Sequence, residues 1–324
     1  MVTENITQAP EFINWSYTYD CNFSCGHCYS RAPNFPGELS EKEYSAIAEQ
    51  LIEANVFRIG FGGGEPFFRK DFLKNLVILS NAGIYTYFTT NGSYINDKVA
   101  DDIQSTNVGM VSVSVDGATK ALHDQIRNRT GSFDLACNAI KLLVDRGIHT
   151  VMTFTVHKQN MHEIEEVITL ARTLSANEVN IKIFRSAGNG KVLEDIFALS
   201  PKQKKSLSQQ IKELKKTSDI KISTFGNFAG AVCSCGNTTL TLRPNGDLVV
   251  CPYTNQIAGN LKDKTLSDIW LNSPVLIQRR LNEKKKCFAD NIQTHWPVSS
   301  NINSVKEKKH SDTVKKKWTL LQNV

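Results

Sequence analysis

Three cysteines lie within eight residues near the start of the chain, and their spacing suits a metal centre. They are Cys21, Cys25 and Cys28, in a C-x3-C-x2-C arrangement directly after an apolar, strand-like run at 12–19. Iron–sulfur clusters are held by cysteine thiolates, and a 4Fe–4S cube has four irons to ligate. Three local thiolates would leave one iron open to a small molecule, which favours a reaction centre over a sealed electron carrier.

Two other uses of these cysteines stay open on spacing alone. His27 directly precedes the last cysteine, and a Cys3His set is a common structural zinc site. In a secreted chain, clustered cysteines would form disulfides. However, the first ten residues lack a basic segment followed by an apolar core, so they do not read as a secretory signal. We therefore predict a cytoplasmic protein, in which the eight cysteines are metal ligands or free thiols.

A glycine-rich segment follows the next strand-like run, which covers 58–61. The segment consists of Gly62, Gly63, Gly64, Glu65 and Pro66. Glycines at the end of a strand let the backbone approach a ligand closely. Taken alone, such a run indicates only a turn between a strand and a helix.

Together, the two motifs resemble those of the radical S-adenosylmethionine (SAM) enzymes. In that family the same cysteine spacing follows the first strand, and a GGEP-like segment follows the second. The resemblance implies that Cys21, Cys25 and Cys28 hold a 4Fe–4S cluster whose open iron is chelated by SAM. It also implies that one-electron reduction cleaves SAM to methionine and a 5′-deoxyadenosyl radical, which abstracts a hydrogen atom from the substrate. Zinc becomes much the weaker alternative.

The resemblance also implies contacts to SAM. The segment Gly62–Glu65 matches the part that approaches the amino group of SAM, where a carboxylate or carbonyl suits an ammonium. Ser114 and Asp116 resemble positions that face the ribose hydroxyls, although an Asp-Gly turn explains Asp116 equally well. Arg127 resembles an arginine that pairs with the SAM carboxylate, and its alternative is a surface arginine. His27 takes the place of an aromatic ring near the adenine, and its alternative is a solvated loop histidine.

The elements that must position these motifs alternate between strand and helix. The expected strands cover 12–18, 58–61, 85–90, 110–115, 150–156 and 179–184, and the expected helices cover 40–55, 71–82, 96–105, 133–146, 161–174 and 201–217. This alternation predicts a parallel sheet, and six right-handed units curl toward an incomplete barrel. The resemblance implies the same α/β fold, a partial (β/α)6 radical SAM barrel. Because sites in such folds lie at the C-terminal ends of the strands, we expect the motifs to share one mouth.

A second pattern begins after about residue 226. Residues 239–243 and 247–250 flank Pro244-Asn245-Gly246 and predict a β-hairpin, for which Asn-Gly favours a type I′ turn. Residues 261–270 predict a short connection and a helix. Further cysteines surround or follow the hairpin, namely Cys233, Cys235, Cys251 and Cys287.

This module resembles the small α+β SPASM/Twitch domains that follow many radical SAM barrels and carry one or two further 4Fe–4S clusters. Cys235, Gly246 and Cys251 fit their C-x9–15-G-x4-C signature. However, Asp290 stands where the family usually has another cysteine three residues after Cys287, and no cysteine follows. The resemblance therefore implies at most one auxiliary cluster, and a zinc-bound or degenerate module is the alternative. The ligands would be Cys235, Cys251 and Cys287, with Cys233 or Asp290 as the fourth.

Composition and charge indicate the general class of the protein and its domain organisation. The chain has 324 residues, 40% of them hydrophobic and 22% charged, which is ordinary for a globular protein of one large or two domains. No apolar run approaches a membrane span. The net charge of +6 comes largely from a lysine-rich end, which indicates a solvated tail and no nucleic-acid partner. We predict a flexible lead-in at 1–10, a barrel at 11–225, an auxiliary-cluster domain at 226–295 and a basic, disordered tail at 296–324.

The resemblance implies an oxidoreductase-type radical SAM enzyme, but the substrate must be argued from the site. Relatives with SPASM domains mostly modify peptides, whereas shorter Twitch relatives often act on small molecules such as sugars. Our leading hypothesis is a peptide-modifying enzyme that receives electrons from a flavodoxin or ferredoxin. Its peptide would arrive on a carrier protein or be recognised directly. A radical oxidase or dehydratase of a small molecule, and a non-catalytic iron–sulfur or zinc scaffold, are the alternatives.

Overall fold

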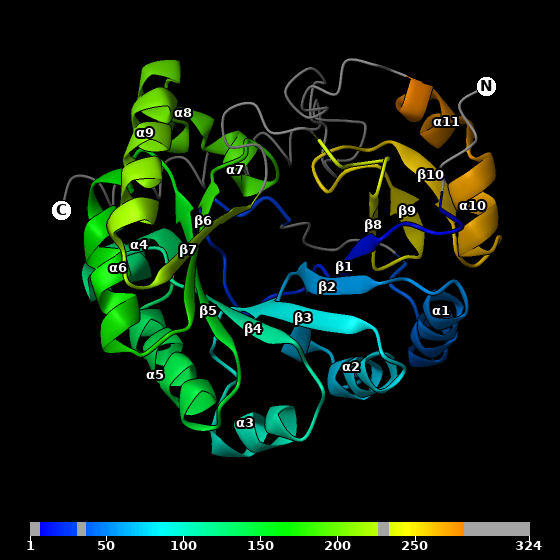
Figure 1. Ribbon diagram of the computed structural model, residues 1–324, viewed down its shortest axis with the longest axis horizontal. Helices are drawn as coiled ribbons and strands as arrows, with labels where there is room; N and C mark the ends of the chain where they lie inside the picture. The colour runs from blue at the N-terminus through cyan, green and yellow to red at the C-terminus, as the bar shows by residue number, and fades with distance from the viewer. Residues whose placement is uncertain (1–6, 31–36, 226–232, 282–324) are drawn as a thin grey trace, which may run out of the picture.

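One curved sheet organises the protein. The computed structural model describes residues 7–30, 37–225 and 233–281. Ten strands form the sheet in the order β10-β9-β8-β1-β2-β3-β4-β5-β6-β7, and β1 to β7 are parallel neighbours in sequence order. Figure 1 shows the helices arranged around the outside of this sheet. The predicted partial barrel with an alternating α/β pattern is therefore confirmed.

The elements have the following bounds. The parallel strands are β1 (Phe12–Thr18), β2 (Arg58–Gly63), β3 (Tyr85–Thr90), β4 (Met110–Ser114), β5 (Thr150–Val156), β6 (Glu178–Ile183) and β7 (Lys221–Phe225). The helices of this part are α1 (Glu41–Glu53), η1 (Pro66–Phe68), α2 (Phe72–Asn81), α3 (Asp97–Gln104), α4 (Lys120–Arg127), α5 (Ser132–Asp145), η2 (Met161–Glu163), α6 (Ile164–Thr173), α7 (Asn189–Val192), α8 (Glu194–Phe197) and α9 (Pro201–Thr217). The C-terminal elements are β8 (Thr239–Leu242), β9 (Asp247–Val249), β10 (Ile257–Asn260), α10 (Leu266–Asn272) and α11 (Pro274–Leu281).

Several short elements were absent from the sequence prediction, namely η1, α4, α7, α8, α11, β7 and β10. Helix α4 lies in what was expected to be a long loop after β4, and β7 and β10 were not anticipated. All of these elements are short, so their apolar periodicity is brief. The end signals of α4 are nevertheless local: Thr119 accepts from the backbone N–H of Leu122, and Asn128 ends the helix in the left-handed conformation with φ 52°.

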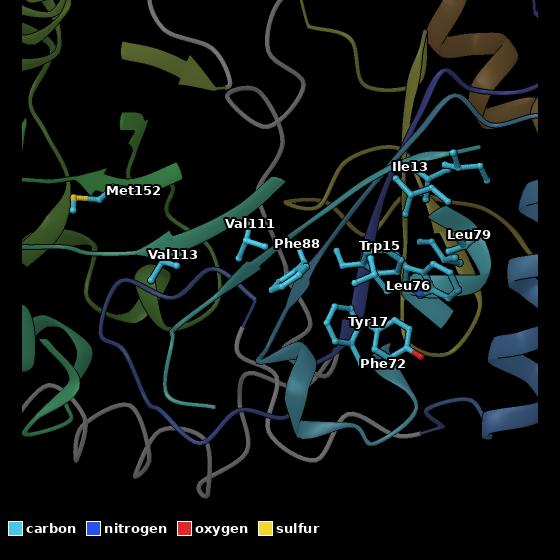
Figure 2. Close-up of a cluster of buried hydrophobic side chains, with 14 of the residues drawn as sticks. Ile13, Trp15, Tyr17, Phe72, Leu76, Leu79, Phe88, Val111, Val113 and Met152 are labelled. Carbon is cyan, nitrogen blue, oxygen red and sulfur yellow. The ribbon is translucent and has the colours of Figure 1, made fainter. Parts of the chain in front are cut away.

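The apolar core lies between the sheet and its outer helices. On β1, alternate residues point outward, and Figure 2 shows Ile13, Trp15 and Tyr17 grouped with side chains from α2. The indole of Trp15 is fully buried and stacks on the ring of Tyr44 from α1, with 5.7 Å between ring centroids. The other face of β1 therefore points into the barrel, where Asn14 lines a cavity.

The C-terminal hairpin continues the barrel sheet. Strand β8 pairs in parallel with β1, and β9 pairs antiparallel with β8, so the predicted hairpin is confirmed. The predicted type I′ turn is wrong, because only Gly246 has a positive φ, of 88°. The loop instead holds three residues between Arg243 and Asp247, with glycine in the left-handed position, as in common three-residue hairpins. Asn245 does not adopt the positive φ that a type I′ turn requires at its first central residue.

No helix among the described residues is long and apolar enough to cross a membrane.

The buried indole of Trp15 provides a test of the core. Trp15→Ala should lower the free energy of unfolding by about 3–5 kcal/mol, because it removes a large side chain and leaves a cavity. The measurement is urea unfolding followed by circular dichroism. Phe57→Ala is the matched control, since that ring is 73% exposed and its loss should have a small effect. Equal unfolding midpoints for the two variants would contradict the assigned core.

Candidate active site

A cavity of about 640 Å³ lies inside the partial barrel, and it collects most of the residues singled out from the sequence. The predicted site residues that line it are Cys21, Cys25, His27, Cys28, Gly62, Gly63, Gly64, Glu65, Ser114, Arg127, Cys233, Cys235 and Cys251. Asp116 is not part of the cavity wall, and Cys287 and Asp290 lie outside the described residues. The two groups of cysteines therefore face one space.

Helix α4 holds one side of the cysteine loop that follows β1. The backbone N–H of Gly26 donates to the carbonyl of Ile126 at 3.1 Å. The amide of Asn128 donates to the hydroxyl of Ser24 at 2.7 Å. Asn128 is also the left-handed residue that ends α4, so the helix end and the loop contact depend on the same residue.

The segment after β6 holds the other side of the loop. Asn189 Nδ2 donates to the carbonyl of Cys25 at 3.1 Å, and the N–H of Gly190 donates to the carbonyl of Cys28 at 3.3 Å. A Cβ on Gly188 would lie 2.7 Å from the carbonyl oxygen of Cys28, so only glycine permits this approach. In the sequence, Gly188 and Gly190 are the local sign of a loop at this position.

The cysteine thiols have polar neighbours that could remain when a cluster binds. Arg127 Nη1 lies 3.8 Å from Cys25 Sγ, and Asn91 Nδ2 lies 3.9 Å from Cys21 Sγ. Burial raises the pKa of the Cys21 thiol to about 11 and that of Cys25 to about 12. Without a metal the thiols are therefore protonated at neutral pH, and bound metal charge would favour the thiolates.

The contacts of His27 weigh against the Cys3His zinc alternative. A zinc ion needs its ligands to converge on one point, whereas each cysteine of a 4Fe–4S cube binds a separate iron. Across 7–30, 37–225 and 233–281, no three His, Cys, Asp or Glu side chains converge in a way that could hold a single ion. His27, the proposed fourth zinc ligand, instead places Nε2 3.2 Å from Asp116 Oδ2.

The three glycines at the end of β2, Gly62 to Gly64, have different roles. A Cβ on Gly64 would lie 2.0 Å from the carbonyl oxygen of Asp20, and Gly63 adopts a φ of 96°. These two glycines let the end of β2 pack against the end of β1, where the N–H of Gly64 donates to Thr18 O at 2.7 Å. A Cβ on Gly62 would meet nothing within 4 Å. Gly62 is thus the glycine that borders open space, as a ligand contact requires.

Glu65 joins this segment to the end of β3. Its buried carboxylate accepts from Thr90 Oγ1 at 2.9 Å and from the N–H of Asn91 at 2.8 Å. Burial raises the pKa of Glu65 to about 7, although these hydrogen bonds lower it in part. A nearby ammonium would favour the ionised form, which fits the predicted contact with the amino group of SAM.

Asp116 is a buried anchor rather than part of the wall. Its carboxylate lies 2.7 Å from Arg127 Nε and 3.2 Å from His27 Nε2, and it accepts from the N–H of Thr155 at 3.0 Å. Burial alone would raise the pKa of Asp116, but Arg127 and His27 together hold it well below its usual range. The carboxylate therefore stays ionised and positions both partners, whereas its contact with a ribose stays a prediction.

The side chains of His27 and Arg127 are largely buried, so neither is the exposed surface residue that the sequence left as an alternative. Their side chains are only 9% and 10% exposed. The ring of His27 lies among those of His157 and Phe197, with centroids at 5.7 and 6.3 Å. Burial lowers the pKa of His27 to about 4, so its imidazole is neutral at pH 7. The proposed roles of both residues toward SAM remain predictions.

Two tyrosines mark the boundary between the two cysteine groups. Tyr29 directly follows Cys28, and Tyr253 lies two residues after Cys251. Their rings meet edge to face with 5.1 Å between centroids, and both line the cavity. The C-terminal module therefore contributes part of the wall beside the first cysteine motif.

The parallel partial barrel, the three thiols beside an open glycine segment and the second group of cysteines are the features expected of an iron–sulfur enzyme. The model of the Radical SAM superfamily matches residues 15–171, and that of the SPASM domain, an iron–sulfur cluster-binding domain, matches 233–290. The chain is 31% identical over 303 residues to mycofactocin maturase MftC of Mycobacterium tuberculosis, covering 89% of this chain and 76% of the relative. This chain belongs to the radical SAM superfamily.

Other similar proteins agree with this assignment. The chain is 25% identical over 308 residues to the AdoMet-dependent heme synthase of Methanosarcina barkeri, covering 87% and 88% of the two chains. The structure of Streptococcus suis SuiB bound to S-adenosylmethionine superposes with a TM-score of 0.72 at 17% identity, covering 86% of this chain and 69% of that one. That of anSMEcpe with bound AdoMet gives 0.67 at 14% identity, covering 82% of each. At these identities the two structures show the fold alone.

The class, enzyme type and cofactors expected from the sequence are thereby confirmed. The protein is a radical SAM enzyme that uses a 4Fe–4S cluster and SAM, and its C-terminal part is a SPASM domain, a type that binds auxiliary iron–sulfur clusters. The individual ligands, the number of auxiliary clusters and the domain boundaries stay predictions.

Replacing the carboxylate that anchors Arg127 tests the buried ion pair. Asp116→Asn should lower the free energy of unfolding by about 3–5 kcal/mol, because it leaves a buried guanidinium without a counter-charge. The measurement is urea unfolding at pH 7. Asp134→Asn is the control, since that carboxylate forms an exposed pair with Lys120 at 2.8 Å, which solvent screens, so its loss should have little effect. A loss no larger than that of the control would contradict the anchoring role.

Iron and sulfide content after anaerobic reconstitution tests the two cysteine groups separately. We expect the triple variant Cys21/Cys25/Cys28→Ala to lose one cluster and keep about one more in the SPASM domain. Cys137→Ala is the control, because this half-buried cysteine on α5 lies outside the cavity wall. It should retain the wild-type iron content. Complete loss of iron in the triple variant would instead show that the second module holds no cluster.

Proposed function

We propose that this radical SAM enzyme modifies a peptide. The similarity to a maturase over 89% of this chain supports the proposal, because it extends through both the barrel and the SPASM domain. The size of the cavity also supports the proposal. Its volume of about 640 Å³ suits a small molecule and part of a larger substrate, within the range of ordinary ligand sites. A peptide would therefore insert one side chain or one end into the barrel.

Polar side chains form part of the cavity wall on the inward faces of the strands, beside apolar and aromatic ones such as Phe12, Tyr87 and Met110. Inward residues with hydroxyl or amide groups are Asn14, Ser112, Ser114, Thr153, Thr155, Asn180, Ser223 and Thr241. Within the described part of the chain, Asn180 Oδ1 and Thr241 Oγ1 are buried and have no hydrogen-bond partner. Because buried polar groups are nearly always paired, these atoms favour a polar ligand such as an amide.

The residues around the cofactor have different proposed roles. When bound, the reduced cluster and SAM supply the 5′-deoxyadenosyl radical that takes a hydrogen atom from the substrate. Glu65 offers a carboxylate to the amino group of SAM, and Arg127 offers a guanidinium to its carboxylate. Asp116 fixes the position of Arg127, and Tyr29 and Tyr253 close the wall toward the SPASM domain.

The proposal includes partners that are needed for turnover. A one-electron donor of the flavodoxin or ferredoxin class would reduce the cluster. A separate carrier protein, or direct recognition, would deliver the peptide. We place the enzyme in the cytoplasm, where thiols stay reduced and remain free to bind iron.

A small-molecule substrate is the second candidate. The similarity to an AdoMet-dependent heme synthase favours it, because the match covers nearly all of both chains at 25% identity. In that case a radical oxidation or dehydration would act on a compound held entirely inside the cavity. The two candidates share the barrel chemistry and differ in whether the substrate extends beyond the mouth.

Reductant-dependent formation of 5′-deoxyadenosine tests the proposed function. The reconstituted enzyme is incubated anaerobically with SAM and dithionite, with or without peptides encoded by short reading frames beside its gene. We expect a peptide to increase the rate and to change in mass, while the triple cysteine variant gives no product. Stimulation by a small molecule, with no peptide altered, would contradict the peptide proposal and leave the enzyme class intact.

A further inference from the structure

Strand β6 places a lysine inside the barrel. Glu178, Asn180 and Lys182 alternate along the strand, and all three line the cavity. Lys182 pairs in register with Thr155 of β5, so it lies near the C-terminal end of the strand. Among the residues that the structure describes, no hydrogen bond or ion pair reaches Lys182 Nζ.

The acidic residues of the cavity wall do not neutralise Lys182. Within the described chain these are Glu65 and Glu178. Glu65 accepts hydrogen bonds from the end of β3, and Glu178 lies 2.7 Å from Lys221 Nζ. Asp116 attracts Lys182 from behind the wall, but its carboxylate is paired with Arg127. The cavity thus holds an ammonium whose counter-charge is not supplied by the wall.

Burial makes the charged form of the Lys182 side chain less favourable than it is in water. It lowers the pKa of Lys182 to about 8, with Asp116 raising the pKa and Arg127 lowering it further. The side chain therefore carries a proton for most of the time at pH 7. Lys182 is half-buried in the cavity wall, where its ammonium has lost part of its water, and an anionic ligand would compensate that loss.

We propose that Lys182 binds a carboxylate of the substrate inside the barrel. The unpartnered Oδ1 of Asn180, two residues away on the same face, accepts from an N–H or O–H of the same substrate. The amide of Asn180 is fixed in orientation, because its Nδ2 donates to Ser223 Oγ at 2.6 Å. The inference does not depend on whether the carboxylate belongs to a peptide or to a small acid.

SAM also carries a carboxylate, and the test must separate the two sources. Arg127, which lies 3.8 Å from Cys25 Sγ, is the cation beside the predicted cluster. Lys182 extends from a different strand, and its register partner is Thr155 rather than any residue of the cysteine loop. We therefore assign Arg127 to the cofactor and Lys182 to the substrate.

The experiment compares Lys182→Met with the wild type, Lys182→Arg and Lys74→Met. Methionine keeps the length of the side chain and removes the half-buried charge, so Lys182→Met should be at least as heat-stable as the wild type. Lys74 lies on α2 in an exposed pair with Glu41 and serves as the control. All four proteins are used as anaerobically reconstituted holoenzymes with SAM bound and no reductant added.

Two probe mixtures are offered to each protein. One contains short peptides, half with Asp or Glu, each with a free or an amidated C-terminus. The other contains small mono- and dicarboxylic acids and their amides. Retained compounds are identified by ultrafiltration and mass spectrometry, and SAM affinity is measured on the same samples.

We expect the wild type to retain carboxylates over the matching amides. Lys182→Met should lose at least tenfold in that retention, Lys182→Arg should keep part of it, and Lys74→Met should match the wild type. The proposal is overturned if the wild type shows no preference for carboxylates, or if Lys182→Met retains them equally. A tenfold loss of SAM affinity in Lys182→Met would also overturn it, because the lysine would then serve the cofactor. Retention of small acids alone would sustain this inference while counting against a peptide substrate.

Discussion

The buried ion pair between Asp116 and Arg127 is the contact on which the candidate site depends. It joins the end of β4 to α4, and through His27 it reaches the cysteine loop. Two charges removed from water are tolerated only when each compensates the other, so neither residue can move alone. The backbone contact between Gly26 and Ile126 lies directly beside this pair. The position of the loop is therefore set by electrostatics as much as by strand geometry.

Much of the fold could be predicted because its signals are local. The strands β1 to β6 are rich in β-branched and aromatic residues, and the expected helix at 40–55 matches α1, whose start carries a Ser40–Glu43 capping box. The pairing of β8 with β1 could not be predicted, since it joins residues more than 200 positions apart whose patterns would suit several neighbours. Tertiary contacts determine which strand pairs with β1.

Some residues of the candidate site could be predicted from the sequence and others could not. Spacing singled out Cys21, Cys25 and Cys28, which line one cavity, because residues of a single loop leave a short pattern in the sequence. It missed Asn189, whose contact with the loop depends on where a distant segment returns. Lys182 did leave a signal: β6 reads Glu-Val-Asn-Ile-Lys-Ile, with polar and apolar residues alternating. Strands of a parallel sheet covered on both faces are usually apolar throughout, so this alternation marks a polar interior.

The continuous sheet also constrains how the two cysteine groups can cooperate. Cys21, Cys25 and Cys28 follow β1, while Cys235 and Cys251 flank the hairpin whose first strand pairs with β1. Both groups are thus attached to neighbouring strands of one hydrogen-bonded sheet, and their separation cannot vary without breaking strand pairs. A hinge between barrel and SPASM domain is therefore incompatible with the pairing of Phe12 to Trp15 with β8. The Tyr29–Tyr253 ring contact adds a side-chain link between the two cysteine groups, so a change in their separation would have to disrupt this contact as well as the strand pairs.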